Sequence, residues 1–231
     1  MALYDRNYND TIENVYVEEG VSVSFMKQTY QLLAASMVTA ALGAYLALPY
    51  AEVIATPAIR WSLFGFVIFM LWFGLGMTRN KPGLNLAALF VLTFAMGVML
   101  VPMLAMLIGM GQAVVIGNAF LMTAVLFGAL SIFAINTKSD FSSWGKSLFI
   151  TMIIVFVLSL ANVLIFKSPI MSVIISAAVL LLFSIYTIYD TQNIANGAYD
   201  SPVDAAVSLF VDFFNMFVSL LNLLGIFSGD D

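Results

Sequence analysis

The sequence predicts an all-α membrane protein, a bundle of seven transmembrane helices joined by short loops. Of its 231 residues, 62% are hydrophobic and only 9% are charged, whereas soluble domains carry about 25% charged residues. Seven apolar stretches each approach the roughly 20 residues that cross a bilayer as a helix. Too few polar side chains remain to cover a surface in water, so lipid must surround most of the chain.

The expected elements follow one another along the chain. A polar, acidic N-terminal tail over residues 1–24 lacks the basic start and apolar run of a signal peptide. A transmembrane domain over residues 25–231 follows, and Gly, Pro and charged residues divide it into spans. The seven spans are 28–48, 61–78, 84–108, 113–136, 145–166, 169–194 and 203–227.

The basic residues predict the orientation of these spans, because Lys and Arg gather in cytoplasmic loops. The side richer in Lys and Arg is the N-terminal one, which places the N-terminus in the cytoplasm and the tail after Phe227 outside. A re-entrant last segment would instead return that tail to the cytoplasm. One side holds Arg6, Lys27, Arg79, Lys81, Lys138 and Lys146, and the other holds Arg60 and Lys167.

The residues that the chain lacks restrict its chemistry. Without Cys it forms no disulfide, thiolate nucleophile or iron–sulfur cluster, and without His it lacks the commonest zinc ligand and general base. Its net charge of −5 argues against a nucleic-acid partner. The loops are too short for a soluble catalytic domain, so we expect neither enzyme activity nor a bound cofactor.

Two aspartates lie inside the spans, where a carboxylate costs about 2.5–3.5 kcal/mol on the insertion scale and should face protein or water. Asp190 is near the cytoplasmic end of the sixth span, and Asp212 is near the middle of the seventh. An ion or proton site is one interpretation. A structural carboxylate satisfied by neighbouring hydroxyl groups is the other.

The seventh span carries a row of polar residues that we call the polar seam. Its members are spaced four, three, four and three residues apart, which keeps them on one face of a helix. Because lipid cannot satisfy polar groups, this face should be buried and the helix central. The polar seam would then either line a polar path or form hydrogen bonds between helices. It consists of Ser208, Asp212, Asn215, Ser219 and Asn222.

Three segments resemble motifs of the transmembrane Bax inhibitor motif family, and the resemblance covers nearly the whole chain after residue 25. Tyr189-Asp190-Thr191-Gln192 is similar to the motif of the sixth helix, and the stretch from Ser208 to Phe217 is similar to that of the last helix. Lys138-Ser139-Asp140-Phe141-Ser142 is similar to the loop before the fifth helix. One departure is Asn222, where family members often carry a basic residue.

The resemblance implies a fold and a function. It implies a bundle wrapped around the last helix and a pH-sensitive calcium leak in which Asp190 and Asp212 share protons. It also implies a latch, a basic residue after the second helix, which is Arg79 or alternatively Lys81. A bacterial-type member is expected in the inner membrane, where some members instead modulate a membrane-bound protease.

Several functional hypotheses remain. The main one is a calcium leak, because two carboxylates with Ser and Asn oxygens supply fewer than the six to eight oxygens that calcium prefers, and transient binding suits permeation. A proton-coupled transporter and a non-conducting regulator of another membrane protein are alternatives. An aspartyl intramembrane protease is disfavoured because Leu209-Phe210-Val211, not Gly-x-Gly, precedes Asp212. The expected partners are lipid, calcium ions, protons and, for a regulator, another membrane protein.

Two structural expectations follow for the aspartates. A short connection lets the sixth and seventh helices pack antiparallel, with Asp212 about two turns deeper than Asp190, so contact requires a bend or a tilt. If the carboxyl groups meet, they titrate as a coupled pair, and calcium and protons compete for it. We also expect Arg79 to pair with Asp190 in a closed state.

Overall fold

The structure is a computed structural model that describes residues 2–79 and 81–227, with side chains from residue 23 onwards except those of residues 82 and 227. This part of the chain is helical, with no strand, and seven stretches are long and apolar enough to cross a membrane. The predicted all-α fold with seven spans is therefore confirmed. The predicted outer tail after Phe227 lies outside the described residues.

The spans correspond to single or interrupted helices. The first consists of α1 (Ala2–Ala47) and the short α2 (Ala51–Ile54), and the second of α3 (Pro57–Phe69), a π-helical turn and α4 (Leu75–Thr78). The remaining five spans each contain one long helix: α5 (Pro82–Gly109), α6 (Ala113–Asn136), α7 (Gly145–Ala161), α8 (Pro169–Ala195) and α9 (Pro202–Phe227).

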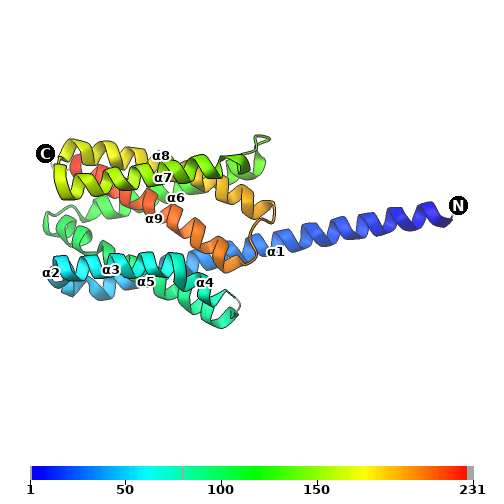
Figure 1. Ribbon diagram of the computed structural model, residues 1–231, viewed down its shortest axis with the longest axis horizontal. Coiled ribbons are helices and arrows are strands. Elements are labelled where there is room, and N and C mark those ends of the chain that lie inside the picture. The colour runs from blue at the N-terminus through cyan, green and yellow to red at the C-terminus, as the bar shows by residue number, and fades with distance from the viewer. Residues whose placement is uncertain (1, 80, 228–231) are drawn as a thin grey trace.

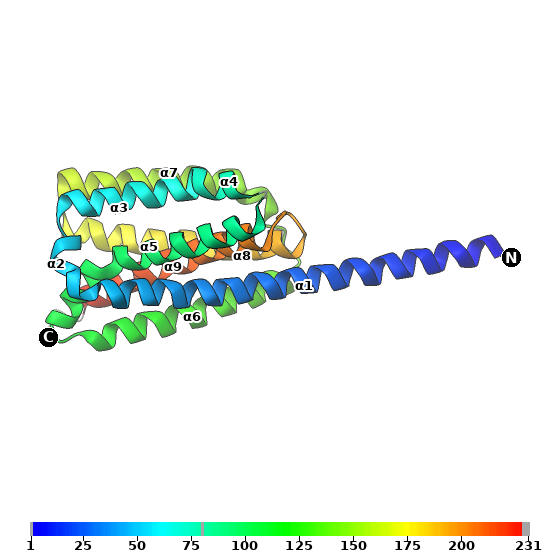
Figure 2. The same cartoon turned by 90° about the horizontal axis from the view of Figure 1, so that it is seen from below.

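The spans alternate in direction, so the bundle has two ends (Figures 1 and 2). At one end, which we call the N-terminal end, α1 projects far beyond the other helices. Residues 1–24 were expected to be a separate polar tail, and from Ala2 onwards they continue α1 without a break. The other end, called the C-terminal end, holds the turn between α5 and α6 and the end of α9.

Helices α1 and α5 approach each other closely. A Cβ atom on Gly97 would overlap the backbone of Ala40, and one on Gly43 would overlap the backbone of Phe94. Small residues let helices approach closely in lipid, where packing replaces the hydrophobic effect as the source of association. On α1, small residues recur every four positions at Ala35, Thr39, Gly43 and Ala47, and a side chain at Gly43 would overlap the α5 backbone.

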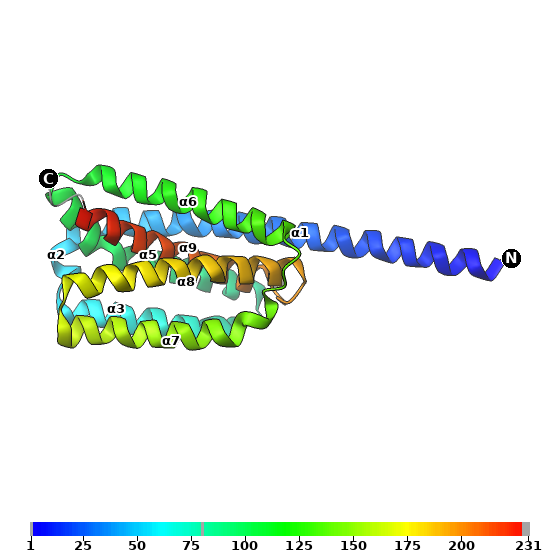
Figure 3. The ribbon, with the colours of Figure 1, turned by 90° about the horizontal axis from the view of Figure 1, so that it is seen from above.

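The last helix is the most buried of the seven spans. Half of its most apolar stretch is buried (50%), against 11–39% in the others. It packs against α1, α5, α6 and α8, and the Phe213 ring meets Phe120 and Phe127 of α6 edge to face. Its position at the centre of the bundle stays a prediction. Figures 1 and 3 show it crossing the bundle obliquely relative to α7 and α8.

Candidate functional site

The two intramembrane aspartates lie side by side between α8 and α9. Asp190 is 6% exposed and Asp212 is 2% exposed, and their carboxyl groups are close enough to share a hydrogen bond. Among the described residues, Asp212 Oδ2 has no hydrogen-bond partner. A proton shared by the pair would satisfy this oxygen and remove one of two repelling buried charges. The oblique course of α9 supplies the tilt that this contact requires.

Tyr199 closes the pair on its N-terminal side. Its hydroxyl donates a hydrogen bond of 2.9 Å to Asp190 Oδ1, and the Ser208 hydroxyl lies next to it. Burial, and then the charge of Asp190, raise the pKa of Tyr199 above the usual range of a phenol. Tyr199 therefore stays protonated and donates. Sequence reasoning missed it because it lies in the loop between α8 and α9, and its one signal is a tyrosine shortly after an intramembrane aspartate.

The latch candidate Arg79 pairs with different aspartates from the predicted one. Its Nε atom donates to Asp204 Oδ2 at 2.8 Å, and a terminal nitrogen lies 3.5 Å from Asp200 Oδ2. The hydrogen bond and charge of Asp204 raise the pKa of Arg79. The expected pairing with Asp190 is thus wrong for this conformation, because Tyr199 occupies Asp190 while Asp204 lies in the first turn of α9 and faces the end of α4.

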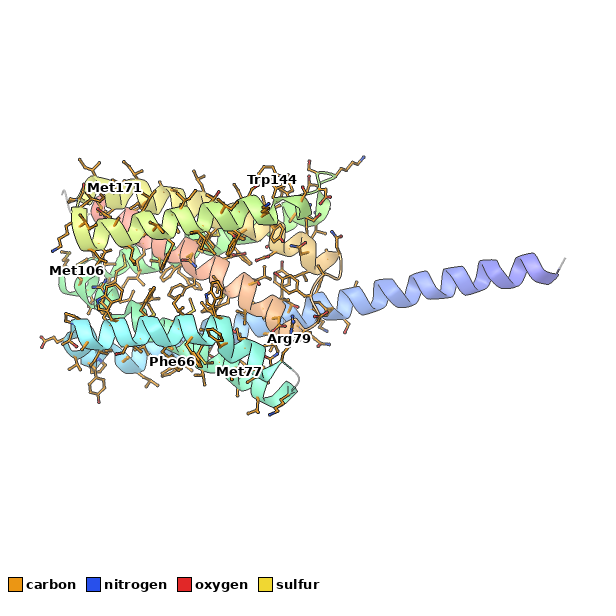
Figure 4. All side chains as sticks on the ribbon, viewed as in Figure 1. Phe66, Met77, Arg79, Met106, Trp144 and Met171 are labelled. Carbon is orange, nitrogen blue, oxygen red and sulfur yellow. The ribbon has the colours of Figure 1, made fainter. Side chains whose placement is uncertain are left out.

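Figure 4 shows Arg79 at the N-terminal end of the bundle, where α4 ends beside the start of α9. Its side chain is half exposed, whereas that of Asp204 is mostly buried. An acidic residue in the first turn of a helix is also stabilised by the helix dipole. Lys81, the alternative latch, is exposed at the start of α5.

Apart from Asp212, the members of the polar seam form hydrogen bonds in two ways. At its two ends it reaches neighbouring elements, through Ser208 beside Tyr199 and through Asn222 Nδ2, which donates to Ser176 Oγ of α8 at 3.0 Å. In its middle, Asn215 and Ser219 donate to carbonyl groups one turn earlier in α9. The polar seam therefore holds helices together at its ends, and a continuous polar path along it stays a prediction.

Gln192 connects two of the motifs on which the family resemblance rests. Its side-chain oxygen accepts a hydrogen bond from the Phe141 amide at 2.9 Å. Its side-chain nitrogen donates to the carbonyl groups of Ser139 at 2.8 Å and Ala134 at 3.2 Å. The loop before α7 is thus fastened to α8 two residues after Asp190, which positions the aspartate against α9.

The site offers few ligands to a cation. No group of three or more acidic, His or Cys side chains that could hold a metal ion occurs in the part of the chain that the structure describes. Two carboxylates are fewer oxygens than a resident calcium ion prefers. Asp190 and Asp212 by themselves therefore supply only part of such a coordination shell.

Comparisons with known proteins identify a family and several bacterial relatives. The family described as "Inhibitor of apoptosis-promoting Bax1" matches residues 22–229. An uncharacterised protein of Helicobacter pylori strain 26695 is 45% identical over 233 residues, which cover both chains fully. Escherichia coli K12 has a relative named "Modulator of FtsH protease YccA", 32% identical over 209 residues that cover 89% of this chain and 91% of the relative. The counterpart in E. coli O6:H1, with the same identity and coverage, is named an inner membrane protein.

Proposed function

Because the chain belongs to the family of inhibitors of apoptosis-promoting Bax1, we propose that it is a non-enzymatic regulator in a bacterial inner membrane that modulates a membrane-bound protease. The observation that carries this proposal is the relative in E. coli K12, whose name states modulation of FtsH protease. That relative aligns with 89% of this chain, which includes most of the transmembrane bundle. The proposal places the N-terminus in the cytoplasm, on the side with more Lys and Arg.

The proposal is tested with purified components. An FtsH-type protease and a membrane-embedded substrate are reconstituted in liposomes with and without this protein, and the degradation rate is measured. We expect the rate to change in the presence of the full chain and not in the presence of an unrelated seven-helix protein. Equal rates in all three preparations, with the protein shown to be inserted, would contradict the proposal.

The buried aspartate pair favours a second candidate function, a pH-sensitive leak for calcium ions. Asp190 and Asp212 come from two different helices and meet inside the bundle with almost no exposure. An ionisable group inside a membrane costs free energy, and such residues typically mark ion or proton pathways. Calcium would be cargo at this pair, bound weakly enough to leave again.

Calcium flux separates the two candidates. Liposomes that contain the protein and a calcium-sensitive dye are exposed to calcium over a series of pH values, and protein-free liposomes provide the background. Flux above this background that varies with pH supports the leak. Background flux at every pH would leave a non-conducting regulator, in which the pair serves as a proton-dependent structural contact.

A further inference from the structure

A second site lies at the other end of the bundle from the latch. A cavity of about 410 Å³ opens between α3, α5 and α7. In Figure 1, α3 and α7 lie apart from each other, with α9 visible between them. The rings of Phe64 and Phe156 stack across this space, with centroids 6.2 Å apart and planes inclined by 7°.

The cavity combines one positive charge with an apolar interior. Arg60 lines it next to Trp61, and its exposed side chain forms no ion pair within residues 23–79 and 81–227. Most of the remaining wall is aromatic or aliphatic, with Met99 and Leu160 beside the two stacked rings. The hydroxyl of Ser159 donates to its own helix at Val155. Arg60 is therefore the side chain of this wall whose positive charge is left for an external anion to neutralise.

The depth of the cavity decides which anion is available. Arg60 is the fourth residue of α3, roughly 5 Å from the start of the span at about 1.5 Å per residue. At that depth an Arg side chain extends to the level of the lipid headgroups, and an adjacent Trp is typical of the same interface. The apolar part of the cavity extends from there into the hydrocarbon region, where it cannot hold water.

We propose that this cavity binds one anionic phospholipid from the leaflet at the C-terminal end of the bundle. Arg60 binds the phosphate through its planar guanidinium group, and one acyl chain lies between α3 and α7 against Phe64 and Phe156. A net negative headgroup is favoured over a zwitterionic one because the charge of Arg60 is not compensated within the cavity. This site is independent of the protease and leak proposals.

Trp61 provides a direct probe, since bromine on an acyl chain quenches tryptophan fluorescence on contact. A full-length variant with Trp72→Phe and Trp144→Phe retains Trp61 alone. It is reconstituted in mixed vesicles of phosphatidylglycerol and phosphatidylcholine in which either lipid, at the same mole fraction, carries the brominated chain. We expect stronger quenching of Trp61 by brominated phosphatidylglycerol than by brominated phosphatidylcholine.

The matched variants replace, one at a time, the two basic residues at the C-terminal end of the bundle, Arg60 and Lys167. Arg60→Gln should abolish the preference for phosphatidylglycerol, whereas Lys167→Gln, which removes the basic residue at this end that does not line the cavity, should retain it. If Arg60→Gln does not accumulate, Arg60→Lys replaces it. Arg60→Lys should show a weaker preference that disappears in high salt, because Lys keeps the charge but not the bidentate geometry.

Three results would overturn the proposal. Equal quenching by the two brominated lipids would mean that the lipid beside Trp61 is bulk lipid and is not bound selectively. The absence of quenching by both would mean that protein rather than lipid covers Trp61 and the cavity. If added inorganic phosphate removes the preference for phosphatidylglycerol, Arg60 binds free anions rather than a lipid headgroup. We expect phosphate to leave the preference unchanged, since the acyl chain contributes to binding.

Discussion

At the scale of single residues, a calcium leak would take its pH dependence from Asp190 and Asp212, whose carboxyl groups meet inside the bundle. A proton held between them would be lost as the pH rises, and a cation would then offset the remaining repulsion. Tyr199 does not titrate in this range, because burial and the nearby charge of Asp190 raise its pKa. Protons and calcium should therefore compete, with calcium binding favoured at higher pH.

The first prediction removes one carboxylate. In wild-type proteoliposomes, the calcium concentration that half-saturates the flux should fall as the pH rises. In Asp212→Asn this dependence should be weaker, since Asp190 alone still titrates but has no neighbouring carboxylate that repels it. Flux over a grid of pH and calcium concentration measures both. The same pH profile in both proteins would exclude the pair as the sensor and leave Asp212 as a structural carboxylate.

The second prediction concerns the hydroxyl that closes the pair. Tyr199→Phe removes the 2.9 Å hydrogen bond and leaves Asp190 Oδ1 without its donor, which should lower the free energy of unfolding by about 1–3 kcal/mol. Thermal unfolding in detergent at fixed pH measures the change. Tyr45→Phe is the matched control, because Tyr45 is 74% exposed. Equal melting temperatures for the two variants would mean that the Tyr199 hydroxyl contributes nothing to stability.

At the scale of helices, the Arg79–Asp204 ion pair fastens the end of α4 to the first turn of α9. The third prediction is that Arg79→Asp raises the leak, because it replaces this attraction with repulsion. Arg79→Asp combined with Asp204→Arg should return the flux toward that of the wild type, since the pair is re-formed with its charges exchanged. Lys81→Gln should leave the flux unchanged. If no substitution of Arg79 changes the calcium flux, Arg79 is not a latch.

The contact between α1 and α5 also belongs to this scale. Gly97→Ala should lower the free energy of unfolding by about 1–3 kcal/mol, because its Cβ atom overlaps the Ala40 backbone and the helices must separate. The control is Gly128→Ala in α6, where no atom lies within 4 Å of the added Cβ. Thermal unfolding of both variants provides the test, and a Gly97→Ala protein as stable as Gly128→Ala would contradict the close packing.

At the scale of the whole molecule, the distribution of basic residues predicts the orientation in the membrane. Arg79, Lys81 and Lys138 lie at the N-terminal end of the bundle, and Arg60 and Lys167 lie at the C-terminal end. The chain has no native Cys, so single cysteines report accessibility cleanly. Ser139→Cys should react with a membrane-impermeant reagent only in inside-out vesicles, and Thr56→Cys only in right-side-out vesicles. The reversed pattern would place the N-terminus outside.

Hydropathy by itself determined the fold class and the seven spans, because the length of an apolar stretch and the lack of charge decide what lipid accepts. It also determined that Asp190 and Asp212 are buried, since a carboxylate inside a span must face protein or water. These properties depend on local sequence alone, which is why they were predictable before any contact was known.

Only the tertiary structure decided which groups meet. The tilt of α9 brings Asp212 to Asp190, the course of the loop after α8 delivers Tyr199 to the same carboxyl group, and the end of α4 directs Arg79 to Asp204. The separation of α3 from α7 likewise leaves Arg60 facing an apolar cavity. Hydrogen bonds and ion pairs form only within a few ångströms, and distances of that size depend on how helices tilt and loops turn, which the spacing of residues along the chain does not specify.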